Sequence, residues 1–167
     1  DGDIRVPLGK AKIVKSGKDI TLVAMSYMSI EAIHAADYLE KQGISCEVID
    51  LRTIKPLDWE TLMESVSKTG HLLALDSGFS TGSVAGEIIA RVSMEKFNAL
   101  KLAPARLAMP DVPEPTSPAL TKGFYVRAAD VAEKVMDMLG KDTGQVRKDL
   151  TEPRPHDIPG KWFTGPF

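Results

Sequence analysis

Apolar residues recur along the chain in two patterns, one typical of buried strands and one typical of helices. Short alternating or continuous apolar segments predict strands at residues 11–17, 19–27, 44–53, 71–77 and 103–109. Between most of them, apolar residues recur every three or four positions, which predicts helices at residues 29–43, 56–70, 83–100 and 126–139. Strands that alternate with helices favour parallel pairing through helical crossovers. The expected fold is therefore α/β, a three-layer α/β/α sandwich.

The apolar pattern stops after Gly140. We therefore divide the chain into a domain at residues 1–140 and a Pro/Gly-rich extended tail at residues 141–167. The tail ends in three large aromatic residues, Trp162, Phe163 and Phe167, and leaving such side chains in water costs roughly 1.5–3 kcal/mol each. We expect these residues to contact a partner subunit, and contact with the chain's own domain is the alternative.

Composition excludes several classes of protein. No apolar segment approaches the ~20 residues that a membrane helix needs. The 21 basic and 23 acidic residues are spread along the chain and give a net charge of −2, so no basic stripe is available for nucleic acid. The single Cys46 excludes an intrachain disulfide and fits a reducing cytoplasm. The chain starts without a secretory leader pattern, and we interpret it as a domain of a longer protein.

The segment from Gly78 to Gly82 fits the G-x-S-x-G pattern, which in some hydrolases exposes a nucleophilic serine between a strand and a helix. The surrounding pattern of strand and helix suits that interpretation, but the remaining triad does not. A hydrolase of that fold places its histidine after the serine, and the only later histidine is His156 in the tail. We therefore reject a serine hydrolase with Ser80 as its nucleophile.

Two interpretations of this loop remain open. In the first, the glycines allow a tight turn and Ser80, Thr81 or Ser83 caps the following helix. In the second, the free amides at the helix start bind an anion or form an interface, with Gly78, Ser80, Thr81, Gly82 and Ser83 as the candidate residues. The chain has neither a G-x-G-x-x-G nor a Walker A string, so the capping interpretation is favoured.

Other candidates for chemistry are weak. Asp50 and Arg52 end a predicted buried strand, where parallel sheets often place functional groups, but a structural ion pair or a strand-end cap is the favoured interpretation. No histidine and carboxylate have the spacing of a metal site. We therefore predict that the domain holds no catalytic, cofactor-binding or metal-ligating residues.

Four strings together resemble a known family: "PLGKAKIVKSGKDITLVAMSYM", "EVIDLRTIKPLD", "TGHLLALDSGFSTGSVAGEIIARV" and "MPDVPEPTSPALTKGF". Their order and spacing are similar to those of the C-terminal domain of transketolase-group thiamine-diphosphate enzymes, especially the beta subunit of 2-oxo acid dehydrogenases of the pyruvate and branched-chain type. The resemblance covers residues 5–140 and leaves the tail out. It implies a five-stranded, mostly parallel sheet with one antiparallel strand.

The resemblance also implies a function and a set of partners. The complete enzyme would use thiamine diphosphate and magnesium, neither of them bound by this domain. Its partners would be an N-terminal pyrimidine-binding domain, an alpha subunit, a second beta subunit and an acyltransferase core. The expected function is that of a non-catalytic assembly and subunit-contact domain. The alternative is a freestanding α/β module that binds an anionic ligand at the loop from Gly78 to Ser83.

Overall fold

A computed structural model describes residues 5–151 and 155–160. Its single sheet has five strands: β1 Lys12–Lys15, β2 Ile20–Ala24, β3 Cys46–Asp50, β4 Leu72–Phe79 and β5 Ala105–Met109. They lie in the order β1-β3-β2-β4-β5. β1 runs antiparallel to β3 at the edge, and every other neighbouring pair is parallel. The predicted mixed sheet is confirmed.

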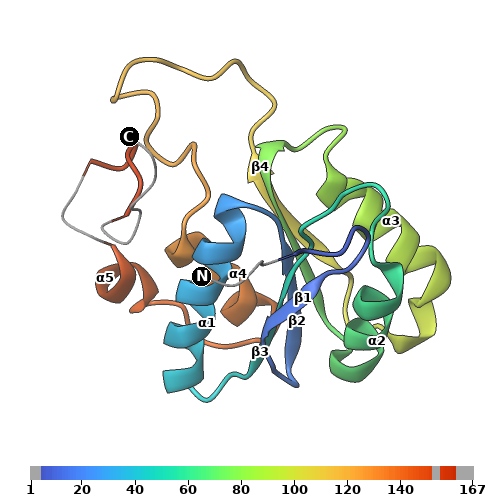
Figure 1. The fold of residues 1–167 in the computed structure, drawn as a ribbon. Coiled ribbons are helices and arrows are strands. Elements are labelled where there is room, and N and C mark those ends of the chain that lie inside the picture. The colour runs from blue at the N-terminus through green and yellow to red at the C-terminus, as the bar shows by residue number, and fades with distance from the viewer. Residues whose placement is uncertain (1–4, 152–154, 161–167) are drawn as a thin grey trace.

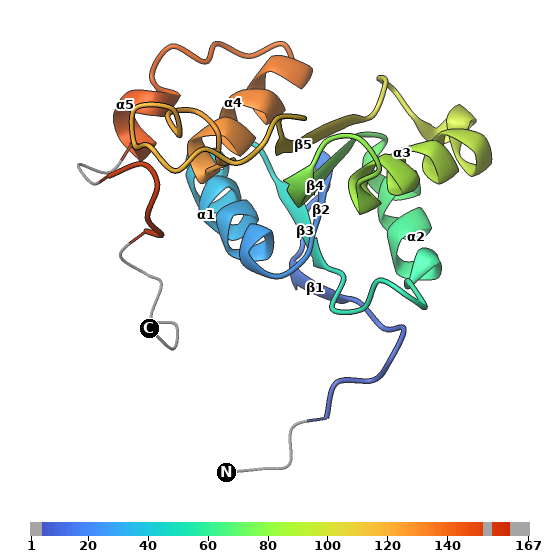
Figure 2. The same ribbon diagram turned by 90° about the horizontal axis from the view of Figure 1, so that it is seen from above.

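Helices cover both faces of this sheet (Figures 1 and 2). The helices are α1 Tyr27–Lys41, α2 Trp59–Thr69, α3 Val84–Glu95, the short 3-10 helix η1 Phe97–Ala99, α4 Ala128–Met138 and α5 Val146–Leu150. α1 and α4 pack on one face, and α2 and α3 pack on the other. Within the described part of the chain, no helix is long and apolar enough to cross a membrane.

Two apolar clusters hold the three layers together. Successive side chains of β2 point to opposite faces of the sheet, and every residue of the strand is buried, so both faces are covered. Leu22 and Ala24 pack in the cluster below α1 and α4, whereas Val23 packs in the cluster below α2 and α3. A strand that is covered on both faces has a mostly apolar sequence. The apolar pattern could therefore predict this part of the fold.

The structure differs from the sequence-based prediction at element boundaries and in one added helix. The strand expected at residues 19–27 ends at Ala24, and α1 already begins at Tyr27. The helix expected at residues 83–100 ends at Glu95 and is followed by η1. In the segment expected to be an extended tail, Val146–Leu150 form the short helix α5. Val146 is only 1% exposed in the cluster below α1 and α4, so this part of the segment packs on its own domain. Trp162, Phe163 and Phe167, the predicted partner contacts, lie outside the described residues.

Candidate functional site at the carboxyl edge of the sheet

The strand order places a topological switch point between β2 and β4. The chain leaves β2 toward β3 on one side and leaves β4 toward β5 on the other. Ligands of open α/β sheets bind outside the carboxyl ends of the strands at such a point. A cavity of about 250 Å³ lies there, and we call it the carboxyl-edge crevice. Its lining includes Tyr27, Asp76, Ser77, Met109, Tyr125 and Arg127.

The loop from Gly78 to Ser83 lies beside this crevice and acts as a helix start. β4 continues through Gly78 to Phe79, and the turn follows at Ser80 to Gly82. The backbone of Ser83 is extended, and its hydroxyl accepts a hydrogen bond from the amide of Gly86 at 3.0 Å. Of the three residues proposed as caps, Ser83 is therefore the one that caps α3.

Two carboxylates already accept hydrogen bonds from backbone amides that a bound anion would need. Asp76 accepts hydrogen bonds from the amides of Gly78 at 2.8 Å and Ala85 at 3.2 Å. Asp111 accepts from both the amide and the hydroxyl of Thr81, each at 2.8 Å. The bond from the Thr81 amide is the main cause of the lowered pKa of Asp111. Because negative charge already satisfies this end of the helix dipole, the anion-binding alternative is not supported.

The capping geometry predicts that Ser83 and Ser80 contribute differently to the stability of the domain. Ser83→Ala is expected to lower the free energy of unfolding by about 1 kcal/mol, because it leaves the Gly86 amide without its side-chain acceptor. Ser80→Ala is the matched control and is expected to change stability by less than about 0.5 kcal/mol. Urea denaturation of both variants measures the difference. A loss at Ser80 as large as that at Ser83 would contradict the assignment.

The described histidines do not complete a hydrolase triad. The His71 ring nitrogen Nδ1 lies 2.7 Å from the backbone oxygen of Asp19, at the opposite edge of the sheet from Ser80. His156 Nε2 lies 2.9 Å from Thr121 Oγ1. His34 lies on α1 and lines a different cavity. The rejection of a hydrolase therefore agrees with the positions of these side chains.

Asp50 and Arg52 form the structural pair that was the favoured interpretation. Arg52 Nε lies 3.7 Å from Asp50 Oδ2, and the Ser29 hydroxyl donates to Asp50 Oδ1 at 3.1 Å. These contacts join the end of β3 to the first turn of α1.

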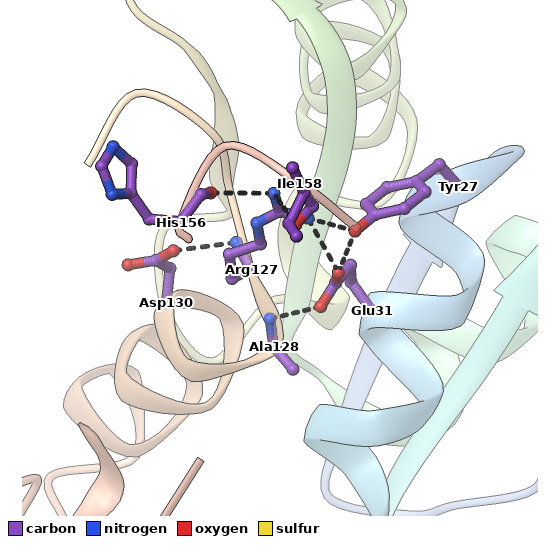
Figure 3. A network of polar contacts seen from close by, with 7 residues as sticks. All are labelled: Tyr27, Glu31, Arg127, Ala128, Asp130, His156 and Ile158. Atoms are coloured by element: carbon purple, nitrogen blue, oxygen red, sulfur yellow. Dashed lines mark hydrogen bonds and ion pairs between the residues drawn. The ribbon is translucent and has the colours of Figure 1, made fainter. Parts of the chain in front are cut away.

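A buried polar network connects α1 to the start of α4 (Figure 3). Glu31 on α1 is only 4% exposed. Its carboxylate accepts from the Tyr27 hydroxyl at 2.6 Å and from the Ala128 amide at 2.7 Å, and it lies 3.5 Å from Arg127 Nη1. Arg127 also donates to the Tyr27 hydroxyl. Burial, and then the bond to Glu31, raises the pKa of Tyr27, so this hydroxyl stays protonated.

The same arginine reaches the C-terminal segment. Arg127 Nη2 donates to the backbone oxygens of His156 at 2.9 Å and Ile158 at 3.1 Å (Figure 3). A second cavity of about 460 Å³ lies between this segment, α4 and α5. Arg127 thus borders both cavities and is the residue that links α1, α4 and residues 155–160.

Sequence reasoning missed this network. Tyr27, Glu31 and Arg127 were not candidates, because nothing in the local pattern separates them from ordinary helix residues. A weak signal was available at Glu31, since a carboxylate on the face of α1 that packs on the sheet needs a partner.

The donor set does not suit thiamine diphosphate or its metal. Among the described residues, no group of three or more His, Cys, Asp or Glu side chains could hold a metal ion. At the edge of the crevice, the amides of Thr81 in the turn and Ala85 in α3 already donate to the carboxylates of Asp111 and Asp76, which would repel a diphosphate.

The fold and the position of the crevice define the class of open, doubly wound α/β domains. Within that class, the model of the transketolase C-terminal domain family matches residues 9–131. The chain therefore belongs to the family of transketolase C-terminal domains.

The similarity of this chain to several known proteins supports the family assignment. The beta subunit of acetoin:2,6-dichlorophenolindophenol oxidoreductase from Cupriavidus necator is 39% identical over 132 residues, which are 79% of this chain and 39% of that protein. The pyruvate dehydrogenase E1 component subunit beta from Rhizobium meliloti is 43% identical over 80% of this chain and 29% of that protein. The mitochondrial counterpart from Pisum sativum is 45% identical over 78% of this chain and 36% of that protein.

A solved structure has the same fold. A split gene transketolase, described as an inactive beta4 tetramer, superposes with a TM-score of 0.72 at 31% identity. The match covers 83% of this chain and 45% of that one. The chain thus spans less than half the length of each of these relatives.

Proposed function

We propose that this chain is the C-terminal assembly and subunit-contact domain of a thiamine-diphosphate-dependent 2-oxo acid dehydrogenase, or of a closely related transketolase-like enzyme. The observation that carries the proposal is the 39–45% identity to beta subunits of such oxidoreductases over most of this chain. In this proposal the domain positions its partner domains and subunits and contributes no catalytic residue. The division at Gly140 and the cytoplasm as compartment remain predictions that rest on the sequence pattern and the single cysteine.

The N-terminal partner is proposed from the part of the relatives that this chain does not span, and the other partners from the relatives' description as beta subunits. The proposed partners are an N-terminal pyrimidine-binding domain, an alpha subunit and a second beta subunit, with an acyltransferase core as a further candidate. Thiamine diphosphate and magnesium belong to the complete enzyme and would be held by those other parts. When bound in the complete enzyme, the cofactor would supply the electron sink for decarboxylation, and this domain would contribute subunit contacts.

Reconstitution tests the proposal. The complete beta polypeptide that contains this chain is co-expressed with its alpha subunit, with and without residues 5–160. We expect the complete pair to assemble and to reduce an artificial electron acceptor in the presence of a 2-oxo acid. We expect the pair without this domain to lose assembly and activity together, which size-exclusion chromatography and the acceptor assay measure.

The isolated chain is the control in the same experiment. It is expected to bind thiamine diphosphate with magnesium no more tightly than about 100 μM, or roughly −5.5 kcal/mol, by calorimetric titration. Tighter binding, or assembly that persists without the domain, would contradict the proposal.

A further inference from the structure

Residues 155–160, which we call the strap, lie across the crevice at the switch point. Asp157 and Pro159 form part of the wall of the carboxyl-edge crevice, and His156 and Ile158 line the larger cavity beside it. The strap thus borders the place at which an open α/β sheet normally receives a ligand. The family match ends at residue 131, so the strap lies outside the shared domain.

The strap is held through its backbone. The guanidinium of Arg127 donates from Nη2 to two strap carbonyls, those of His156 and Ile158. A third contact joins His156 Nε2 to Thr121 Oγ1 at 2.9 Å. Because the Thr121 hydroxyl donates to the backbone oxygen of Pro118 at 3.1 Å, it accepts the proton of the His156 ring nitrogen.

Apolar burial contributes little to this contact. Ile158, the strap's one large aliphatic side chain, is 42% exposed. By contrast, α5 is fixed by Val146, which is 1% exposed. Hydrogen bonds near the surface exchange with water at a small net cost, so the strap can leave the crevice without unfolding the core. Pro155 and Pro159 restrict the free segment, which lowers the entropy lost when it is seated again.

We propose that residues 155–160 are a releasable strap that closes the carboxyl-edge crevice, with Arg127 as its latch. While the strap is seated it excludes any other occupant. A partner enters by presenting an extended peptide backbone whose carbonyls replace those of His156 and Ile158 on Arg127. This inference goes beyond the proposed function, which requires no strap.

Spin labels on the full chain test the proposal. Pro155→Cys and Glu64→Cys place labels at exposed positions on the strap and on α2. Cys46 stays unlabelled, because it is buried and burial raises the pKa of its thiol to about 12. Double electron–electron resonance then reports the seated and released populations. We expect one narrow distance for the otherwise unchanged chain.

Variants identify the latch. Arg127→Lys keeps a cation beside Glu31 but loses the planar donor group, and we expect it to raise the ratio of released to seated strap by about tenfold. His156→Ala removes only the side-chain contact with Thr121 and leaves Arg127 in place, and it is expected to act in the same direction, so the test survives if Arg127→Lys folds poorly. Arg147→Lys is the matched control, since Arg147 lines the same cavity but bonds to Asp130 and Glu133. It should leave the distances unchanged.

Competition separates a releasable strap from a permanent one. An added peptide of residues 151–160, TEPRPHDIPG, should displace the strap and broaden the distances. No displacement, a broad distribution in the unchanged chain, or no response to either Arg127→Lys or His156→Ala would overturn the proposal. A dipolar signal between singly labelled chains would place a second copy's strap in the crevice and would also overturn it. No partner subunit takes part, so failure here leaves the assembly proposal standing.

Discussion

Gly17→Ala is expected to lower the free energy of unfolding by about 3 kcal/mol or more. For a chain of this size that corresponds to a fall of roughly 6–12 °C in melting temperature. A Cβ at Gly17 would lie 2.1 Å from the carbonyl carbon of Cys46 and 2.3 Å from the amide nitrogen of Glu47. Cys46 is also paired with Ile20 of β2, so the backbone cannot retreat without disturbing the β2–β3 ladder.

Gly144→Ala is the matched control for this prediction. Neither glycine has a positive φ, but a Cβ at Gly144 would meet only the exposed side chain of Asp142, at 3.3 Å. That carboxylate can move, so the change is expected to cost less than about 0.5 kcal/mol. Thermal unfolding followed by circular dichroism compares the two variants. Similar losses for both would show that the close approach to β3 is not the cause.

The sheet could be predicted from sequence because each of its central strands has a local apolar pattern that indicates a buried strand. The segments that contain β2, β3 and β4 are mostly apolar, since helices cover both faces of the sheet, and glycines or polar turns separate them from the helices. The pattern also predicted a strand at β1, but its antiparallel pairing came from the family resemblance. Its half-exposed pattern is short and gives no information on pairing direction.

Helix ends were predicted less well than helix positions. The pattern continued to Leu100, but the helix stops at Glu95 and η1 follows, because tertiary contacts decide where a helix ends. α5 was missed for a related reason. Its five residues are too few to form a helix alone, and the burial of Val146 against the main core stabilises it.

The polar network was beyond sequence reasoning. The Ala128 amide and the Glu31 carboxylate are 97 positions apart, and the Arg127 guanidinium and the Tyr27 hydroxyl are 100 apart. No local pattern carries such pairs, because only the packing of α1 on α4 brings them together. The loop at Ser83 was more accessible, since capping is a local property. The sequence reduced the candidate capping residues to three, and the structure shows that Ser83 is the cap.

Glu31 is the member of this network whose loss is expected to cost most. Its carboxylate receives the Tyr27 hydroxyl and the Ala128 amide and compensates the charge of Arg127. Among the described residues, every buried side-chain polar atom has a hydrogen-bond partner. Glu31→Ala therefore creates buried groups without partners in a structure that otherwise avoids them, and such groups are costly in a low-dielectric interior.

We expect Glu31→Ala to lower the free energy of unfolding by about 3 kcal/mol, at the lower end for a broken buried pair because the Arg127 side chain is 26% exposed to water. Glu31→Gln keeps one acceptor oxygen for the Ala128 amide but removes the charge and puts an NH2 donor where the other oxygen accepted from Tyr27, so it should cost about half as much. Glu133→Ala is the control. It removes a carboxylate paired with the exposed Arg147 and should cost less than about 1 kcal/mol. Urea denaturation at pH 7 ranks the three variants. If Glu31→Ala is no more damaging than Glu133→Ala, the network does not join α1 to α4 energetically, and its contacts only follow from packing that the apolar residues already determine.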